Sequence, residues 1–156
     1  TLVLEPDNTE ALYMSAMVAE PLKKYDLMEQ RLRRVMVLKP DYAQAYNALG
    51  YSLADRNTRL EEAAPLLDKA LSLAPDDAAI LDSVAWLKFR QGDFAGAIEM
   101  IQRAMAKLED AEILSHHVEI LHASGDKEAA RSAYASAKEK FPDSPLLRTV
   151  GQRLGF

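Results

Sequence analysis

Three histidines close together in the C-terminal third are the residues with the clearest potential for chemistry. His116, His117 and His122 share the stretch SHHVEILH with Glu119. Zinc proteases place two histidines four residues apart on one helical face, with a glutamate directly after the first. Here His117 and His122 are five residues apart, so three ligands do not converge on one face. The stretch predicts a solvated or core-edge histidine group and no metal site.

Other signatures of catalysis or of nucleic acid binding are absent from the sequence. It has no nucleophile-elbow pattern, phosphate-binding loop or dinucleotide fingerprint. It also has no cysteine, which excludes disulfides and thiolate chemistry. The net charge of −5 argues against a surface that follows phosphates, and no run approaches the roughly 18 apolar residues of a membrane helix. We therefore expect no enzyme, no cofactor, no nucleic acid partner and no membrane insertion by this segment.

The elements that position these residues follow a repeat of about 34 residues. Four columns of mostly small or apolar residues recur at steps of 33 to 35. The columns are Met28, Ala63, Ala97 and Ala130; Leu32, Leu67, Ile101 and Tyr134; Val35, Ala70, Ala104 and Ala137; and Ala16, Gly50, Ala85 and Val118. Such a period is typical of a solenoid, in which helical hairpins stack and bury their core between neighbours. The fold class is therefore predicted as all-α.

The repeat predicts two helices in each unit. First helices are expected at about 9–20, 43–54, 78–91 and 111–124, and second helices at about 26–38, 59–73, 94–107 and 127–140. Small residues such as Gly50 should lie where paired helices cross closely, with Ala70 facing a neighbouring hairpin. Ser144 and Pro145 have the pattern of an N-cap followed by proline at the first helical position, which opens a last helix.

Two local patterns bear on where the second helices begin. Asp26 with Glu29, and Thr58 with Glu61, have the spacing of capping boxes. Pro65 lies beyond the first turn counted from Thr58, where proline removes a backbone hydrogen bond. We expect either a kink at Pro65 or a later start of that helix.

The repeat resembles the tetratricopeptide repeat, a pair of antiparallel helices in about 34 residues. The best-matching unit carries Tyr46, Leu49, Gly50, Leu53, Ala63, Leu67, Ala70 and Pro75. The resemblance implies a right-handed α-solenoid of about four units, at 7–40, 41–75, 76–109 and 110–143, with a capping helix at 145–154. Residues 1–6 copy the end of a unit, as residues 71–75 show, and are interpreted as the tail of a missing upstream repeat.

In this family the first helices line a concave groove that holds protein partners, which implies a set of groove residues here. The predicted partner-binding residues are Tyr13, Met17, Asn47, Tyr51, Asp82, Trp86, Phe89, Arg90, Glu119 and His122. The aromatic members suit a binding surface, although single aromatic residues at helical spacing also pack between helices. Asn47 and Arg90 are the expected polar anchors. The lysine and asparagine clamp that grips acidic C-terminal tails in some family members is missing.

A finer resemblance concerns residues 46–56 and 74–86, YNALGYSLADR and APDDAAILDSVAW. They look like the C-terminal part of bacterial outer-membrane tetratricopeptide lipoproteins, some of which act as adaptors for a carboxyl-terminal processing protease. The resemblance implies a non-catalytic scaffold or adaptor that binds a protein or peptide. It also implies a bacterial periplasmic or outer-membrane location through the parent chain, with the cytoplasm as the alternative. The alternative function is a self-associating, homo-oligomeric repeat module without a peptide ligand.

Overall fold

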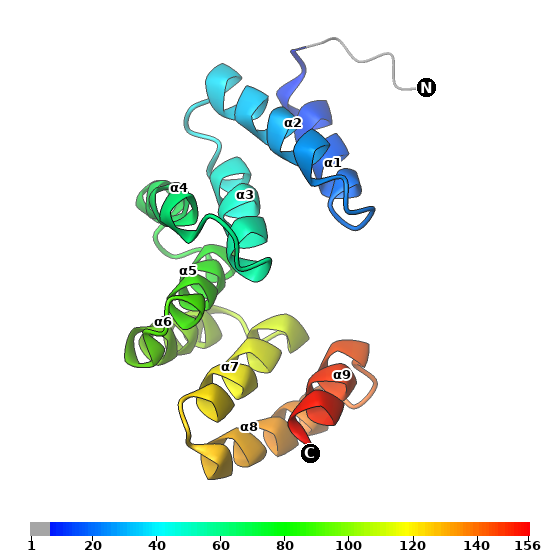
Figure 1. Ribbon diagram of the computed structural model, residues 1–156, viewed down its shortest axis with the longest axis vertical. Helices are drawn as coiled ribbons and strands as arrows, with labels where there is room; N and C mark the ends of the chain where they lie inside the picture. Colours follow the sequence, from blue (N-terminus) through cyan, green and yellow to red (C-terminus); the bar gives the residue numbers. More distant parts are fainter. Residues whose placement is uncertain (1–6) are drawn as a thin grey trace. The chain divides into compact units, whose positions relative to one another are not determined.

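The computed structural model describes residues 7–156, and these residues form an all-helical protein with nine helices (Figure 1). The chain divides into two compact units, one ending at Pro75 and one beginning at Asp76. The interpretation of residues 1–6 as the tail of an upstream repeat lies outside the described residues. None of the described helices is both long and apolar enough to cross a membrane.

The first unit holds two helical hairpins. Helix α1 (Thr9–Ala19) pairs with α2 (Tyr25–Leu38), and α3 (Ala43–Asp55) pairs with α4 (Leu60–Leu73). Helices α2 and α3 also pack together and join the hairpins. The repeat columns form the core, because Ala16, Leu32, Val35 and Leu67 are fully buried.

The second unit has the same plan with one more helix. Helix α5 (Ala78–Arg90) pairs with α6 (Phe94–Lys107), and α7 (Ala111–Ala123) pairs with α8 (Lys127–Lys140). Helix α9 (Pro145–Leu154) packs against α7 and α8, and Leu147 of α9 is fully buried. Every helix lies within one residue, at either end, of the range expected from the sequence.

Side-chain caps fix where six of these helices begin. Each cap accepts a hydrogen bond from the backbone N–H three residues later, which satisfies one of the donors left open at a helix start. The capping residues are Asn8, Asp77, Asp93, Asp110, Asp126 and Ser144. The predicted cap at Ser144 is thereby confirmed, with Pro145 at the first helical position.

The two predicted capping boxes are wrong. Helix α2 begins at Tyr25, so Asp26 already lies inside the first turn, and α4 is preceded by Arg59 in the left-handed region with φ 46°. Neither helix has a side-chain cap. Glu29 instead accepts from Arg59 at 2.6 Å, an ion pair that holds the start of α4 against α2. The Arg59 hydrogen bond is the main cause of the lowered pKa of Glu29.

Pro65 neither delays nor ends its helix. Helix α4 runs without interruption from Leu60 to Leu73, and Pro65 is exposed within it. The expectation of a later helix start is therefore wrong. An exposed position limits the cost of the missing N–H, because water can hydrogen-bond the carbonyl that the proline leaves without a donor.

Each hairpin turns through a residue with positive φ at the same place in the repeat. These residues are Lys23, Asn57, Gly92 and Gly125, with φ of 58°, 51°, 81° and 96°. Glycine adopts this conformation without a steric cost, whereas lysine does not. The first hairpin therefore has the least favourable turn residue of the four.

Candidate functional site

The predicted partner-binding residues fall into one group in each unit, and the two groups differ in character. Those of the first unit lie on α1 and α3 and are all half-buried: Tyr13, Met17, Asn47 and Tyr51. Those of the second unit lie on α5 and α7, and most of them contact one another or α9: Asp82, Trp86, Phe89, Arg90, Glu119 and His122.

The first group contains one buried polar atom with an unmet hydrogen-bonding need. Oδ1 of Asn47 is buried, and no donor among the described residues reaches it. A buried acceptor without a donor costs about 1–3 kcal/mol, so such atoms are rare in folded proteins. Tyr51 lies one helical turn further along α3, on the same side of the helix as Asn47. This part of α3 therefore combines an aromatic side chain with an acceptor that needs a donor.

Tyr13 on α1 has a more enclosed setting than an open groove would give. Its ring packs against that of Tyr42 with the centroids 5.3 Å apart. Burial raises the pKa of Tyr13, and the Tyr42 and Glu20 charges raise it further. The phenol therefore stays neutral at physiological pH.

The second group is built around Trp86, which is only 4% exposed. Its ring stacks on the ring of Phe89, with the centroids 4.6 Å apart, and on the ring of His116 in α7, with the centroids 4.1 Å apart. The Arg90 guanidinium lies over the Trp86 ring at 5.1 Å. These neighbours enclose the ring, as in the alternative that an aromatic residue at helical spacing packs between helices. Whether Trp86 contributes to partner binding stays a prediction.

Asp82 and His116 form a buried pair between α5 and α7. Oδ1 of Asp82 lies 2.8 Å from Nδ1 of His116, and the two residues are 5% and 7% exposed. In this contact the imidazole N–H donates and the carboxylate oxygen accepts. The pair fixes the ring that stacks on Trp86. Buried ion pairs contribute little net stability, since desolvation offsets their attraction.

Glu119 and His122 are engaged by the C-terminal end of the chain. Glu119 forms an ion pair with Arg153 of α9. The rings of His122 and Phe156 pack in a T-shaped arrangement with their centroids 6.0 Å apart. His117, between the two other histidines in the sequence stretch, has a pKa lowered by burial. The capping helix therefore covers this end of the predicted groove.

The sequence interpretation missed the role of His116 as the partner of Asp82. These residues are 34 positions apart, one more than the 33-residue step from Ala85 to Val118, and they lie on the neighbouring first helices α5 and α7. The repeat period itself was the available signal, since residues one period apart lie on neighbouring first helices.

Comparisons with known proteins agree with this geometry. The tetratricopeptide repeat family matches residues 26–78 and 85–145. A TPR repeat-containing protein of Pseudomonas aeruginosa is 45% identical over 111 residues, which are 71% of this chain and 19% of that protein. The chain thus spans about a fifth of the length of this relative.

Solved structures show the same fold. A thermophilic TPR protein of Thermus thermophilus superposes with a TM-score of 0.85 at 24% identity, covering 96% of this chain and 82% of that one. MamA of Desulfovibrio magneticus superposes with a TM-score of 0.72 at 21% identity, covering 90% and 80%. At these identities the likeness concerns the fold alone.

Proposed function

The chain belongs to the tetratricopeptide repeat family, and on that premise we propose that it is a non-catalytic scaffold that binds a protein or peptide along its first helices. Repeat arrays of this kind use such surfaces to bind proteins, and function has to be argued from the site itself. The observation that carries the proposal is the buried Oδ1 of Asn47 without a donor. Rotation of the half-buried Asn47 side chain would present this acceptor to a backbone N–H of an extended partner segment, which would supply the donor and remove the cost of the unmet hydrogen bond.

The test separates folding from binding at Asn47. Asn47→Ala removes an acceptor that lacks a donor, so the free energy of unfolding should stay unchanged or rise slightly. Binding of a partner purified with the full-length protein should weaken by about 0.5–1.5 kcal/mol, the net value of one hydrogen bond. Gln44→Ala is the matched control, because Gln44 is exposed on the same helix three residues earlier. Unchanged affinity in Asn47→Ala would contradict the proposal.

We further propose that the scaffold serves in the bacterial envelope, as an adaptor for a protease or for assembly of a complex. The resemblance of residues 46–56 and 74–86 to outer-membrane lipoproteins supports this, as does the bacterial source of the 45% identical relative. Fractionation of the native bacterium with an antibody against the full-length protein tests the location. Recovery in the cytoplasmic fraction alone would rule it out. Co-purification of a carboxyl-terminal processing protease at native expression levels tests the adaptor role.

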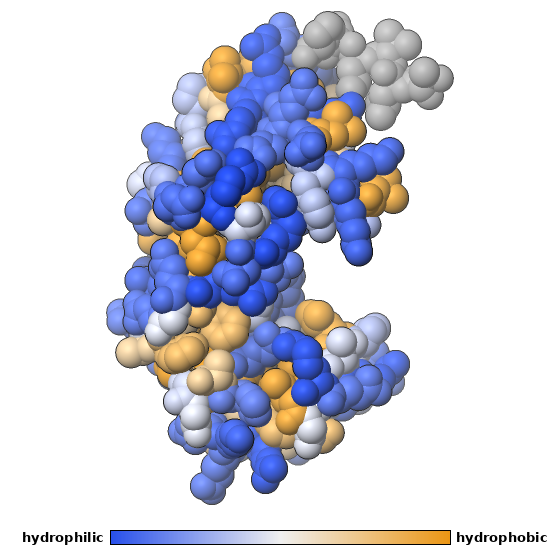
Figure 2. Space-filling model, in the orientation of Figure 1, coloured by the Kyte–Doolittle hydropathy of each residue, from blue (hydrophilic) through white to orange (hydrophobic). Residues whose placement is uncertain are grey.

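A second candidate function, self-association, rests on an exposed apolar face of α1. Met14 and Val18 are 60% and 61% exposed. The positions equivalent to Val18 in the repeat are Ser52 on α3, Leu87 on α5 and Ile120 on α7, which are 1%, 5% and 0% exposed. Both α3 and α7 pack against a preceding second helix of their own unit. The exposed face of α1 is therefore apolar like the faces that other first helices bury. Apolar patches interrupt the hydrophilic surface of the first unit around α1 and α2 (Figure 2).

Sedimentation velocity tests self-association directly. The wild-type chain should show a concentration-dependent dimer, and Val18→Glu should be a monomer because it places a charge in the apolar contact. Leu146→Glu is the control, since Leu146 is also apolar and exposed, at 43%, but lies on α9. A wild-type chain that stays monomeric at every concentration would exclude this function.

A further inference from the structure

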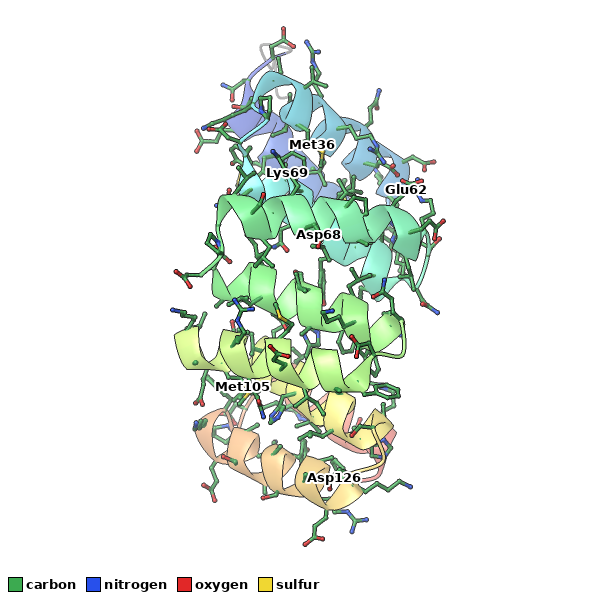
Figure 3. All side chains as sticks on the ribbon, turned by 90° about the vertical axis from the view of Figure 1, so that its left-hand side faces the viewer. Met36, Glu62, Asp68, Lys69, Met105 and Asp126 are labelled. Atoms are coloured by element: carbon green, nitrogen blue, oxygen red, sulfur yellow. The ribbon has the colours of Figure 1, made fainter. Side chains whose placement is uncertain are left out.

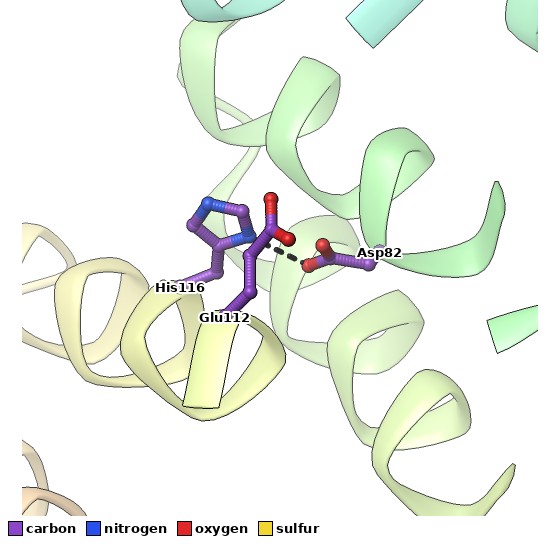
Figure 4. Close-up of side chains that lie close together, drawn as sticks. All are labelled: Asp82, Glu112 and His116. Atoms are coloured by element: carbon purple, nitrogen blue, oxygen red, sulfur yellow. Dashed lines mark hydrogen bonds and ion pairs between the residues drawn. The ribbon is translucent and has the colours of Figure 1, made fainter. Parts of the chain in front are cut away.

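We propose that Asp82, Glu112 and His116 form a binding site for a divalent transition metal ion, with Zn²⁺ as the best match. Within the described part of the chain, the ligand atoms of these three side chains all lie within 4.8 Å of one another. Figure 4 shows Asp82 approaching from α5, while Glu112 and His116 approach from α7. The site does not depend on the proposed partner-binding function.

Two of the three ligands are already held in place. Oδ1 of Asp82 and Nδ1 of His116 lie 2.8 Å apart, so the two atoms have to separate by roughly 0.6 Å to bind one tetrahedral metal ion. With metal–ligand bonds of roughly 2.1 Å, tetrahedral ligand atoms lie about 3.4 Å apart. Stacking on Trp86 fixes the plane of the imidazole, and both side chains are buried. Preorganised ligands lose little conformational freedom when an ion binds.

Glu112 supplies the third ligand, and it lies on the side of the site that is open to solvent. It lies four residues before His116, so both side chains share one face of α7. Glu112 is exposed, so its carboxylate can close the remaining distance by rotation of its side chain. A site with two enclosed ligands and one exposed ligand is open to an ion from solvent.

The donor set selects among metal ions. One imidazole nitrogen and two carboxylate oxygens suit Zn²⁺ and its transition-metal neighbours, whereas Mg²⁺ and Ca²⁺ prefer sites made of oxygen alone. Three protein ligands leave one tetrahedral position for water or for a side chain from another molecule. A metal-bound nitrogen carries no proton, so the proton on Nδ1 of His116 is released to solvent when the ion binds.

Trp86 provides a built-in reporter. It is the sole tryptophan of the chain, and its ring is stacked on the imidazole of His116 at 4.1 Å. A metal ion on Nδ1 changes the charge beside the indole, so the tryptophan fluorescence should change with the same dependence on Zn²⁺ concentration as the heat of binding.

The experiment is an isothermal titration of the full chain with Zn²⁺, with Trp86 emission followed in parallel. We expect one Zn²⁺ per chain, and no comparable binding of Mg²⁺ or Ca²⁺. Glu112→Gln should weaken Zn²⁺ binding at least about tenfold, because even outer-shell changes at metal sites cost roughly 10–100-fold. His116→Gln should abolish it. Glu112 is exposed, so Glu112→Gln keeps the test valid even if His116→Gln does not fold.

Two controls separate this site from adventitious binding. Glu99→Gln changes another exposed glutamate, on α6, and His117→Gln changes the neighbouring histidine. Both should bind Zn²⁺ like the wild type. The proposal is overturned if the wild type binds no Zn²⁺, if Glu112→Gln binds it with unchanged affinity, or if His117→Gln loses it. In the last case the ion would belong to the adjacent histidine instead.

Discussion

Replacement of Gly50 by alanine tests the packing between α3 and α4 at its tightest point. A Cβ atom at this position would lie 2.6 Å from Cγ and 2.7 Å from Cδ2 of Leu67. Carbon atoms in good contact lie about 3.5–4.0 Å apart, so roughly 1 Å has to be recovered. Leu67 is fully buried, and its Cγ is only one bond beyond Cβ, so it cannot move aside freely.

Two opposing terms set the size of the effect. Overpacking of a core typically costs about 1–3 kcal/mol. Alanine in place of glycine inside a helix gains about 1 kcal/mol. Gly50→Ala should therefore lower the free energy of unfolding by a net amount of up to about 2 kcal/mol. A helix without the close contact would instead be stabilised.

A double-mutant cycle with Leu67→Ala shows which term acts. In that background the clashing atoms are gone, so Gly50→Ala should stabilise the protein by about 1 kcal/mol. The four proteins are unfolded with urea in one buffer containing sucrose, which offsets the roughly 2–5 kcal/mol that Leu67→Ala costs. A Gly50→Ala effect of the same sign and size in both backgrounds would refute the packing described here.

Three further predictions follow from the repeat register, the hairpin turns and the half-buried His117. Ala70→Leu should destabilise the chain by about 1–3 kcal/mol, whereas Lys69→Leu, on the exposed side of α4 (Figure 3), should change it by less than about 0.5; similar urea midpoints would contradict the register. Lys23→Gly should raise the melting temperature, because lysine is strained at φ 58°; a lowered value would show that the turn is not limiting. The pKa of His117 is lowered in the folded state, so the unfolded chain binds the proton first and stability should fall as the pH drops below about 6.5. His117→Gln should lessen this loss of unfolding free energy between pH 7.5 and 5.5. A pH profile identical to that of the wild type would show that the burial of His117 does not cause the loss.

The helices and the core were predictable because both follow from the repeat. Leu32, Leu67 and Ile101 of one column are fully buried, and the fourth member, Tyr134, is half-buried, since each unit turns the same face towards its partner helix. Gly50 was expected at a close crossing, and its separation from Leu67 confirms that expectation. Regular spacing carries this information because it reflects backbone geometry shared by all units.

Helix starts in the first unit were predicted less well. Asp26 and Thr58 have the residue types and spacing of caps, yet Lys24 and Arg59 occupy the cap positions. The ion pair between Glu29 and Arg59 takes up the glutamate that a capping box would have used. At Glu29 the local capping rule fails because a contact between hairpins competes for the same carboxylate, whereas Thr58 is separated from the start of α4 by Arg59.

The setting of the candidate site depends on neighbours that a single helix does not reveal. Taken alone, α5 presents Trp86 on a face away from Leu81 and Val84, which favours a groove-facing aromatic side chain. Phe89 on the same helix and His116 on α7 nevertheless enclose the ring. A groove assignment from one helix therefore overestimates the exposure of large side chains.

Polar residues that break the repeat columns are a better guide to chemistry than residues that are close in sequence. The positions equivalent to His116 hold Ala48 and Ser83, which are small and make no demand for a charged partner. A histidine there, on the helix that packs against the one carrying Asp82, needs a carboxylate within reach because burial without a partner is costly. The 2.8 Å contact meets that need, and Glu112 adds a second carboxylate that the pair does not require for burial. Three ligand atoms within 4.8 Å of one another, two of them on buried side chains, distinguish this candidate cation site from an ion pair of two residues.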